Sequence, residues 1–241
     1  MDRQYVWLIW SSAFLLPWLG LYLGWPQHRE VMWRTSLMTM LFGLTEPLFV
    51  PEYWHPPSLF DLAESTGFDV ESLIFAFGIG GVGAVLYNVL TGRRPASFAA
   101  TEKEASRHRW HRLAVLVPAI VFPPLYFFME WNAIYAAIAA LTAGAAAAAL
   151  CRPDLAVKTL VGGSLFAAYY FVFMIALVWS APGYIDAVWN LLALSGVSVV
   201  GIPLEELLFG ASFGMYWSGV YEHLAWNRTL RTSAIQRSGS L

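Results

Sequence analysis

Long apolar stretches separated by short polar segments run through almost the whole chain. A stretch of about 20 largely apolar residues is long enough to cross a bilayer as an α-helix. By this criterion the pattern predicts seven transmembrane helices and therefore an all-α membrane fold. The predicted spans are residues 5–25, 31–50, 70–92, 113–129, 131–150, 159–180 and 200–224.

The two halves of the chain share a pattern of residues at a constant spacing of 134 positions. A spacing shared over a whole helix indicates two related halves. We therefore expect two three-helix repeats joined by a linking helix. The predicted parts are a first repeat (1–92), a basic loop with the linking helix (93–130), a second repeat (131–224) and a cytoplasmic tail (225–241). The matching positions are Glu71, Leu73, Phe75, Gly80 and Tyr87 with Glu205, Leu207, Phe209, Gly214 and Tyr221.

Composition and charge agree with a membrane protein and predict its orientation. Hydrophobic residues make up 58% of the chain and charged residues 12%. All lysines and arginines except Arg3 lie in or beside alternate connections between the predicted spans. Because basic loops stay in the cytoplasm, we expect an outside N-terminus and a cytoplasmic C-terminus in a bacterial or archaeal plasma membrane. The lipid bilayer is then a partner and nucleic acid is not; a homo-oligomer is compatible with the sequence.

Carboxyl groups open two of the predicted helices at the same, external, membrane face. Glu205 and Glu206 begin the last span directly after Pro203, and Glu71 begins the third. Carboxyl groups are costly inside lipid and are commonly functional there, and parallel repeats commonly place a site at their interface. A helix N-terminus favours the ionised form, whereas burial and mutual repulsion favour a proton. The pair can thus divide into an acid and a base; the alternative is that both residues only cap the helix.

Two further acids complete the set of candidate catalytic residues. Glu46 lies deep in a predicted span, where capping explains nothing. An ion pair with Arg34 is the alternative, but twelve helical positions separate the two residues by about 18 Å. Asp69 precedes Glu71, although Asp69, like three acids of the preceding connection, can also be a solvated loop charge. Those three acids are Glu52, Asp61 and Glu64.

Aromatic residues follow the candidate acids at helical spacing. With about 3.6 residues per turn, Glu205, Phe209, Ser212 and Tyr216 lie on one helix face, and Glu206 is turned by about 100°. Phe75 follows Glu71 one turn later in the first half. An aromatic ring can stabilise a cation by about 0.5–2 kcal/mol. We therefore predict that four residues contact the substrate, and that it passes through a carbocation: Phe75, Phe209, Ser212 and Tyr216.

Two other motifs are interpreted as structural. Gly78, Gly80 and Gly83 have the spacing of a dinucleotide-binding fingerprint, but that motif needs a preceding strand. Within an apolar helix, small residues favour close helix packing instead. His108 and His111 are three positions apart; a metal site is the weaker alternative, and we expect them in a solvated cytoplasmic loop near anionic lipid. With a single cysteine and no cysteine cluster, we expect no metal and no cofactor.

The segment from Pro203 to Phe209 resembles the Pro-x-Glu-Glu/Asp signature of a known family. This family comprises the integral-membrane lycopene cyclases of the heterodimeric or fused type, which differ from the flavin-containing cyclases with soluble folds. The resemblance extends from Trp7 to about Leu224 and includes two three-helix modules with one linking helix. The first module, from Phe68 to Ser72, lacks the proline and the second acid.

The resemblance implies cyclisation of a carotenoid end group to a β- or ε-ionone ring. In such a reaction a carboxylic acid protonates the terminal double bond, a neighbouring double bond closes a six-membered ring, and a base removes a proton. The enzyme would be a redox-neutral intramolecular lyase or isomerase without metal or hydride carrier. Glu205 or Glu206 would act together with Glu71 and Glu46, and which residue donates the proton stays open.

Other functions remain alternatives from the residues alone. An intramembrane prenyltransferase would use Asp61, Glu64, Asp69 and Glu71 to hold Mg²⁺ on a diphosphate. A proton-coupled transporter would also have paired halves and intramembrane acids. A retinal pigment is disfavoured because it needs a lysine in its last span, whereas we expect Lys103 and Lys158 in loops.

Overall fold

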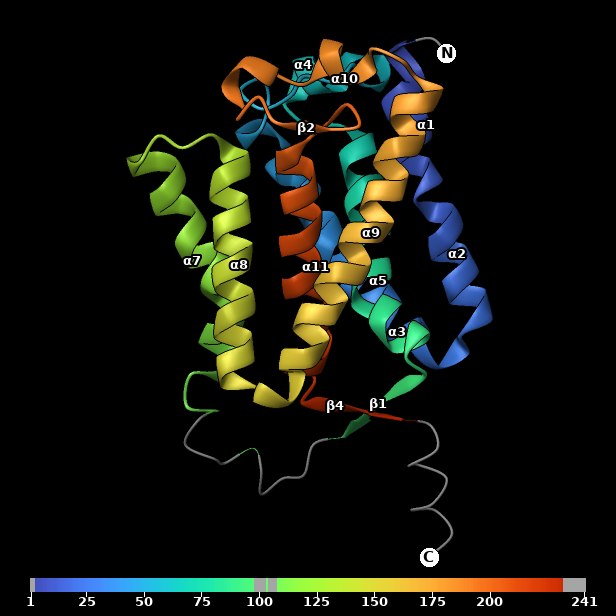
Figure 1. The fold of residues 1–241 in the computed structure, drawn as a ribbon, viewed down its shortest axis with the longest axis vertical. Helices are drawn as coiled ribbons and strands as arrows, with labels where there is room; N and C mark the ends of the chain where they lie inside the picture. Colours follow the sequence, from blue (N-terminus) through green and yellow to red (C-terminus); the bar gives the residue numbers. More distant parts are fainter. Residues whose placement is uncertain (1–2, 98–102, 104–107, 232–241) are drawn as a thin grey trace, which may run out of the picture.

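Roughly parallel and antiparallel helices run between the two ends of the molecule and form most of its structure (Figure 1). The computed structural model describes residues 3–97, 103 and 108–231. Parts of the predicted basic loop and the end of the predicted tail lie outside these residues.

The α-helices are α1 (Arg3–Ala13), α2 (Leu15–Gly24), α3 (Arg29–Met40), α4 (Leu62–Thr66), α5 (Val70–Leu90), α7 (His111–Phe128), α8 (Ala133–Cys151), α9 (Ala156–Ser180), α10 (Tyr184–Val188) and α11 (Leu204–Leu224). The short 3₁₀ helices are η1 (Pro26–His28), η2 (Leu41–Leu48), η3 (Leu59–Asp61), η5 (Pro153–Leu155) and η6 (Leu191–Ala193), and the strands are β1 (Arg93–Ser97), β2 (Ser198–Val199), β3 (Ile202–Pro203) and β4 (Asn227–Arg231).

Within the described residues, five helical segments are long and apolar enough to cross a membrane. They coincide with five of the seven predicted spans, so a mostly helical structure with helices able to span a membrane is confirmed, while the count of seven stays a prediction. The other two predicted spans correspond to α3 with η2 and to α11, which carry more polar and charged residues. The five segments are Arg3–Gly24, Val70–Leu90, His111–Phe128, Ala133–Cys151 and Pro153–Ser180.

The second predicted span, 31–50, is not one continuous α-helix. The α-helix ends at Met40, and residues Leu41–Leu48 continue as a 3₁₀ helix that contains Pro47. The reason is local, because Pro47 has no amide hydrogen to bond to the Gly43 carbonyl, and its ring would clash with that carbonyl in an α-helix. This tighter turn carries Glu46.

Glycines allow the central helix α5 to approach its neighbours closely. A Cβ atom at Gly80 would overlap the side chain of Thr39 in α3, and one at Gly78 would lie 2.8 Å from the Cβ of Phe14. One at Gly83 would lie 3.1 Å from the Phe213 ring of α11. The structure therefore confirms that these glycines serve helix packing, and no nucleotide-binding strand precedes them in the described chain.

The helices α5 and α11 have the same length, and a short strand follows each of them at the same distance along the chain. Each has 21 residues, and each is followed at the same spacing by a strand, β1 or β4. These strands pair antiparallel with Pro95 opposite Thr229 at the centre, and these two residues are themselves 134 positions apart. An antiparallel pair centred on equivalent residues is the arrangement that a two-fold axis between the strands produces. The division into three-helix repeats stays a prediction.

The ends of the bundle differ in structure. The end at which α5 and α11 begin, here called the acidic end, is covered by the segments that contain α4, α10 and β2 (Figure 1). The other end, here called the strand-pair end, holds β1 and β4. At the acidic end the segment after η2 is tied to the segment after α10 by a bridge between Trp54 and Trp189 and by the bond from the Asn190 amide to the Tyr53 carbonyl, 2.9 Å. This connection brings two segments that are distant in sequence over the start of α11.

Candidate active site

Glu206 lies at the acidic end in a cage of three neutral donors. Its Oε1 atom accepts a hydrogen bond from the Tyr53 hydroxyl and another, 2.8 Å long, from Trp189 Nε1. Its Oε2 atom accepts a 2.6 Å bond from the Tyr170 hydroxyl. The Glu206 side chain is buried. An ionised carboxylate accepts and cannot donate, so three donors that reach both oxygens match the acceptor character of a carboxylate.

The three donors come from three different elements. Tyr53 follows η2, Tyr170 lies in α9, and Trp189 follows α10. Burial is the main cause, and the nearby Glu206 carboxylate the second, that raises the pKa of Tyr53 well above its usual value. Tyr53 therefore stays protonated and available as a donor over the whole physiological range.

Tyr170 also joins the aromatic residues of the two halves. Its ring centroid lies 6.4 Å from that of Phe75 in α5 and 6.1 Å from that of Phe209 in α11. The rings of Phe75 and Phe209, which the sequence places one turn after an acid in each half, thus meet at the tyrosine that holds Glu206. Their contact with a substrate stays a prediction.

The other two predicted substrate contacts lie elsewhere on α11. The Ser212 hydroxyl donates to the carbonyl of Phe209 in its own helix, 3.1 Å away. The Tyr216 hydroxyl donates to the Val115 carbonyl of α7. Both side chains are buried, and each hydroxyl donates its hydrogen bond to a backbone carbonyl. Neither of these hydrogen bonds involves the Glu206 cage.

Glu205 points to a different group of residues from Glu206. Its Oε1 atom accepts bonds from the Tyr135 hydroxyl of α8, 2.6 Å, and from the Ser195 amide, 2.8 Å. Its Oε2 atom is buried without a hydrogen-bond partner among the described residues. Tyr135 also lines an open pocket of about 670 Å³ at the acidic end. The remaining lining residues are Glu52, Glu130, Trp131, Asn132, Asn190 and Ala193.

Glu46, Asp69 and Glu71 form a second group of buried carboxyls, here called the acid triplet. Ser72 connects two of them, because its hydroxyl donates to Glu46, 3.0 Å, and its amide donates to Asp69, which caps α5. Glu71 accepts a 2.7 Å bond from the Leu59 amide. Within the described chain, each of the three carboxyls keeps one buried oxygen without a hydrogen-bond partner.

The structure decides between the alternatives for these acids. Arg34 pairs with Glu30 at 2.9 Å on the surface, so the ion pair between Arg34 and Glu46 is wrong. Asp69 is buried, and burial raises its pKa, so a solvated loop charge is wrong for Asp69. The interpretation as solvated loop charges is correct for Glu52, Asp61 and Glu64, which are exposed.

Tryptophan rings lie between the acid triplet and the Glu206 cage. The Trp54 side chain lies beside Glu46 and packs against Trp189, with ring centroids 5.3 Å apart. Trp7 packs edge-on against Trp54 at 4.7 Å and also against Phe75 at 5.3 Å. Apolar, electron-rich ring surfaces therefore separate the acid triplet from Glu206. Such surfaces stabilise cations but not anions.

The Mg²⁺-binding set of a prenyltransferase is not assembled in the described residues. Asp61 and Glu64 are exposed, whereas Asp69 and Glu71 are buried and accept bonds from backbone amides. Among the described residues, these four acids form no group whose oxygens could share one ion.

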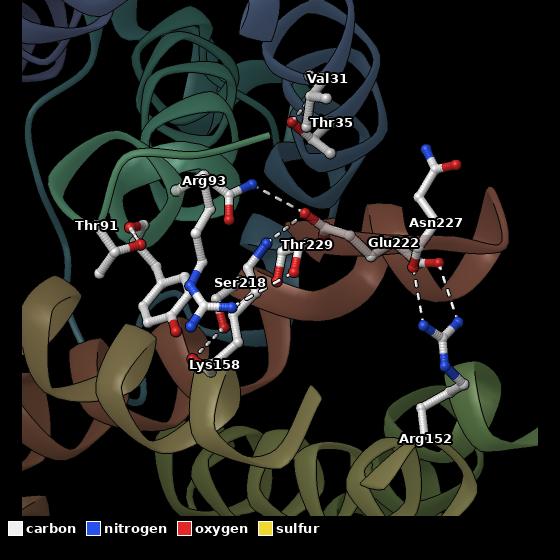
Figure 2. Close-up of polar contacts among 12 residues, drawn as sticks. Val31, Thr35, Thr91, Arg93, Arg152, Lys158, Ser218, Glu222, Asn227 and Thr229 are labelled. Carbon is white, nitrogen blue, oxygen red and sulfur yellow. Dashed lines mark hydrogen bonds and ion pairs between the residues drawn. The ribbon is translucent and has the colours of Figure 1, made fainter. Parts of the chain in front are cut away.

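A buried ion pair at the strand-pair end was not expected from the sequence. Lys158 donates to Glu222 (Figure 2), and Asn88 donates to the same carboxylate oxygen at 2.9 Å. The expectation that Lys158 lies in a loop is wrong, because it lies in the first turn of α9 and is 2% exposed. The available signal was the repeat itself, since Asn88 and Glu222 occupy equivalent positions.

The fold and the site together define a helical membrane protein with buried carboxyl groups set among aromatic rings. This combination suits acid–base chemistry on an apolar molecule. The family model for lycopene cyclase matches residues 132–224, and the match assigns this part of the chain to a lycopene cyclase family. It includes Glu205, Glu206, Tyr170 and Trp189, whereas Tyr53 and the acid triplet precede it. No curated protein and no solved structure matches the chain.

Proposed function

We propose that the protein is a membrane carotenoid cyclase of the heterodimeric or fused type, which closes a β- or ε-ionone ring on a lycopene-like substrate. The observation that supports this most directly is the caged Glu206, which lies within the family match and beside aromatic rings from both halves. A charged carboxylate next to ring faces is the environment that a carbocation intermediate needs.

The proposed reaction is an isomerisation. An acid transfers a proton to one carbon of the terminal double bond, and the other carbon becomes a tertiary cation. The electrons of a neighbouring double bond form a carbon–carbon bond that closes the six-membered ring and moves the cation into it. A base then removes a proton next to the cation, and the electrons of that C–H bond form the ring double bond. No electrons are gained or lost overall.

In this proposal the acid triplet supplies the proton, and Glu206 faces the cation and receives the proton. Glu46, Asp69 and Glu71 are crowded, buried and only partly hydrogen-bonded, and one shared proton relieves the repulsion between like charges. The three donors around Glu206 instead match a carboxylate that stays charged. The different surroundings of the two groups divide the roles of acid and base.

The rings between the two groups then form the wall along which the end group is placed. Trp54, Trp7 and Phe75 connect the triplet to the cage. Aromatic faces stabilise a passing cation without reacting with it, by about 0.5–2 kcal/mol for each ring. Glu205 has a positioning role in this account, because it holds the segment before β2 onto α8 through Ser195 and Tyr135.

The function is tested by expressing the full chain in cells that accumulate lycopene and analysing the pigments by chromatography and mass spectrometry. We expect cyclic products of unchanged mass in ordinary water. In heavy water we expect one additional deuterium for each ring, because the proton that starts the reaction comes from an exchangeable carboxyl group. Unchanged lycopene, or turnover that depends on Mg²⁺ and a prenyl diphosphate, would contradict the proposal.

A further inference from the structure

We propose a metal site for Zn²⁺, or a similar divalent transition-metal ion, at the strand-pair end, formed by His108, His111 and Cys151. The three side chains are buried, and their ligand atoms lie within 4.8 Å of one another. The site is distant from the carboxyl groups of the proposed active site, and the cyclisation does not use it. It is therefore an inference beyond the proposed function.

The helical hairpin explains why these residues meet. His111 is the first residue of α7 and Cys151 the last residue of α8. The two helices are of similar length, run antiparallel and lie side by side (Figure 1). The beginning of α7 and the end of α8 therefore lie at the same end of the molecule, and His108 precedes α7 by one turn. The expectation of a solvated loop is wrong for both histidines, since each is only 6% exposed.

The two distances from the sulfur to the histidine nitrogens fit the edges of a tetrahedral metal centre. Cys151 Sγ lies 3.6 Å from His108 Nδ1 and 3.6 Å from His111 Nδ1. With a Zn–S bond of about 2.3 Å and a Zn–N bond of about 2.0–2.1 Å, a tetrahedral angle gives an S–N edge of about 3.6 Å. Mixed sulfur and nitrogen ligands also favour zinc over magnesium or calcium.

The surroundings of His111 orient it as a ligand. Its Nε2 atom lies 2.8 Å from the carbonyl oxygen of His223. A carbonyl can only accept, so Nε2 carries the hydrogen and Nδ1 of the neutral ring presents its lone pair toward Cys151. A ring hydrogen bonded to a backbone carbonyl is the usual second contact of a metal-binding histidine.

Stacking fixes the plane of the same ring. The His111 ring lies 3.6 Å from the Trp226 ring and 3.9 Å from the His223 ring, at angles of 11° and 18°. Two rings cannot share one face at these distances, so they cover opposite faces of His111. These contacts of His111 connect the proposed metal site on the hairpin of α7 and α8 to the end of α11.

Three protein ligands leave a fourth position of the tetrahedron. A water molecule or another small ligand would occupy it.

The test uses the purified full-length protein in detergent, stripped with a chelator and reloaded with Zn²⁺ or Co²⁺. We expect about one bound metal per chain, and a thiolate-to-cobalt charge-transfer absorption in the near ultraviolet. Cys151→Ser and His111→Ala should each lower the metal content by at least about tenfold. His55→Ala is the matched control, because His55 is exposed at the acidic end, and it should bind metal like the parent protein.

The unmodified protein provides a second measurement that does not depend on the folding of a variant. Zn²⁺ should slow alkylation of Cys151, the single cysteine, and should displace the cobalt absorption. Less than about a tenth of an equivalent of metal after reloading, or alkylation that Zn²⁺ does not change, would overturn the site. The cluster would then be a hydrogen-bonded Cys–His–His group only.

Discussion

At the residue scale, the notable property of Glu206 is that its partners among the described residues are neutral donors and not a cation. Two tyrosines and a tryptophan bind its oxygens within an aromatic environment. A neighbouring lysine or arginine would repel a carbocation, whereas neutral donors leave the negative charge of Glu206 available to it. The cage would therefore reconcile a buried carboxylate with the proposed chemistry, which develops positive charge.

Removing one donor tests the cage. Tyr170→Phe keeps the ring between Phe75 and Phe209 but removes the hydroxyl that bonds Glu206. A hydrogen bond to a charged group contributes about 1.5–3 kcal/mol, so we expect ring formation to slow by about tenfold or more. Tyr169→Phe is the control, because the Tyr169 hydroxyl has no hydrogen-bond partner among the described residues. Equal rates of ring formation in isolated membranes for the two variants would contradict the cage.

The raised pKa of Asp69 predicts a pH dependence of stability. Burial raises the folded-state pKa above the ordinary value, which is about 3.9. Between the two values the folded protein binds more protons than the unfolded protein, so the free energy of unfolding falls as pH rises through this window. Asp69→Asn keeps an acceptor for the cap of α5 and removes the titration. Unfolding in detergent across pH should show this fall in the parent and not in the variant; parallel curves would be the contrary result.

At the element scale, packing follows patterns that are local in sequence, whereas the site depends on how connections fold. Apolar runs predict where the five long apolar helices lie, and small residues predict close contacts of α5. The apolar pattern alone predicts a continuous α-helix around Glu46. The 3₁₀ turn observed there follows only when the effect of Pro47 on the helix is taken into account. Tyr53 and Trp189 could not be predicted as partners of Glu206, since no periodic signal fixes the path of the connections that carry them.

Glycine packing makes a direct prediction for stability. Gly80→Ala should lower the thermal midpoint, because the new methyl group overlaps the side chain of Thr39 and overpacking costs about 1–3 kcal/mol. Gly20→Ala in α2 is the matched control, since a Cβ there meets nothing within 4 Å. Thermal unfolding followed by size-exclusion chromatography measures both. A midpoint of Gly80→Ala equal to that of Gly20→Ala would show that the approach of α3 and α5 is not as close as described.

At the scale of the whole molecule, contacts between equivalent positions hold the two halves together. Pro95 pairs with Thr229 between β1 and β4, and Asn88 bonds Glu222 between α5 and α11. The sequence predicts related halves from the spacing of the acids. The same spacing relates Asn88 to Glu222, but it does not place Lys158 beside them, because a lysine beside a predicted span is ordinarily assigned to the surface.

This ion pair should behave as one unit. Lys158→Met alone leaves Glu222 buried without its charged partner, and breaking a buried pair costs about 3–5 kcal/mol. We expect Lys158→Met and Glu222→Gln to lower stability strongly when made singly, and the double variant to lose much less than their sum. Thermal midpoints in detergent complete the double-mutant cycle. Additive losses would indicate that Lys158 and Glu222 contribute independently.

The central claim is that Glu206 is the carboxylate that makes ring closure possible, and replacing it by glutamine in lycopene-accumulating cells tests this claim most directly. Asp61→Asn, which neutralises an exposed acid at the same end, is the control, and the amount of inserted protein is measured for both. We predict at least about a hundredfold loss of cyclic pigment for Glu206→Gln, as expected for loss of an acid–base group, and normal cyclisation for Asp61→Asn. Full ring formation by inserted Glu206→Gln would contradict the account.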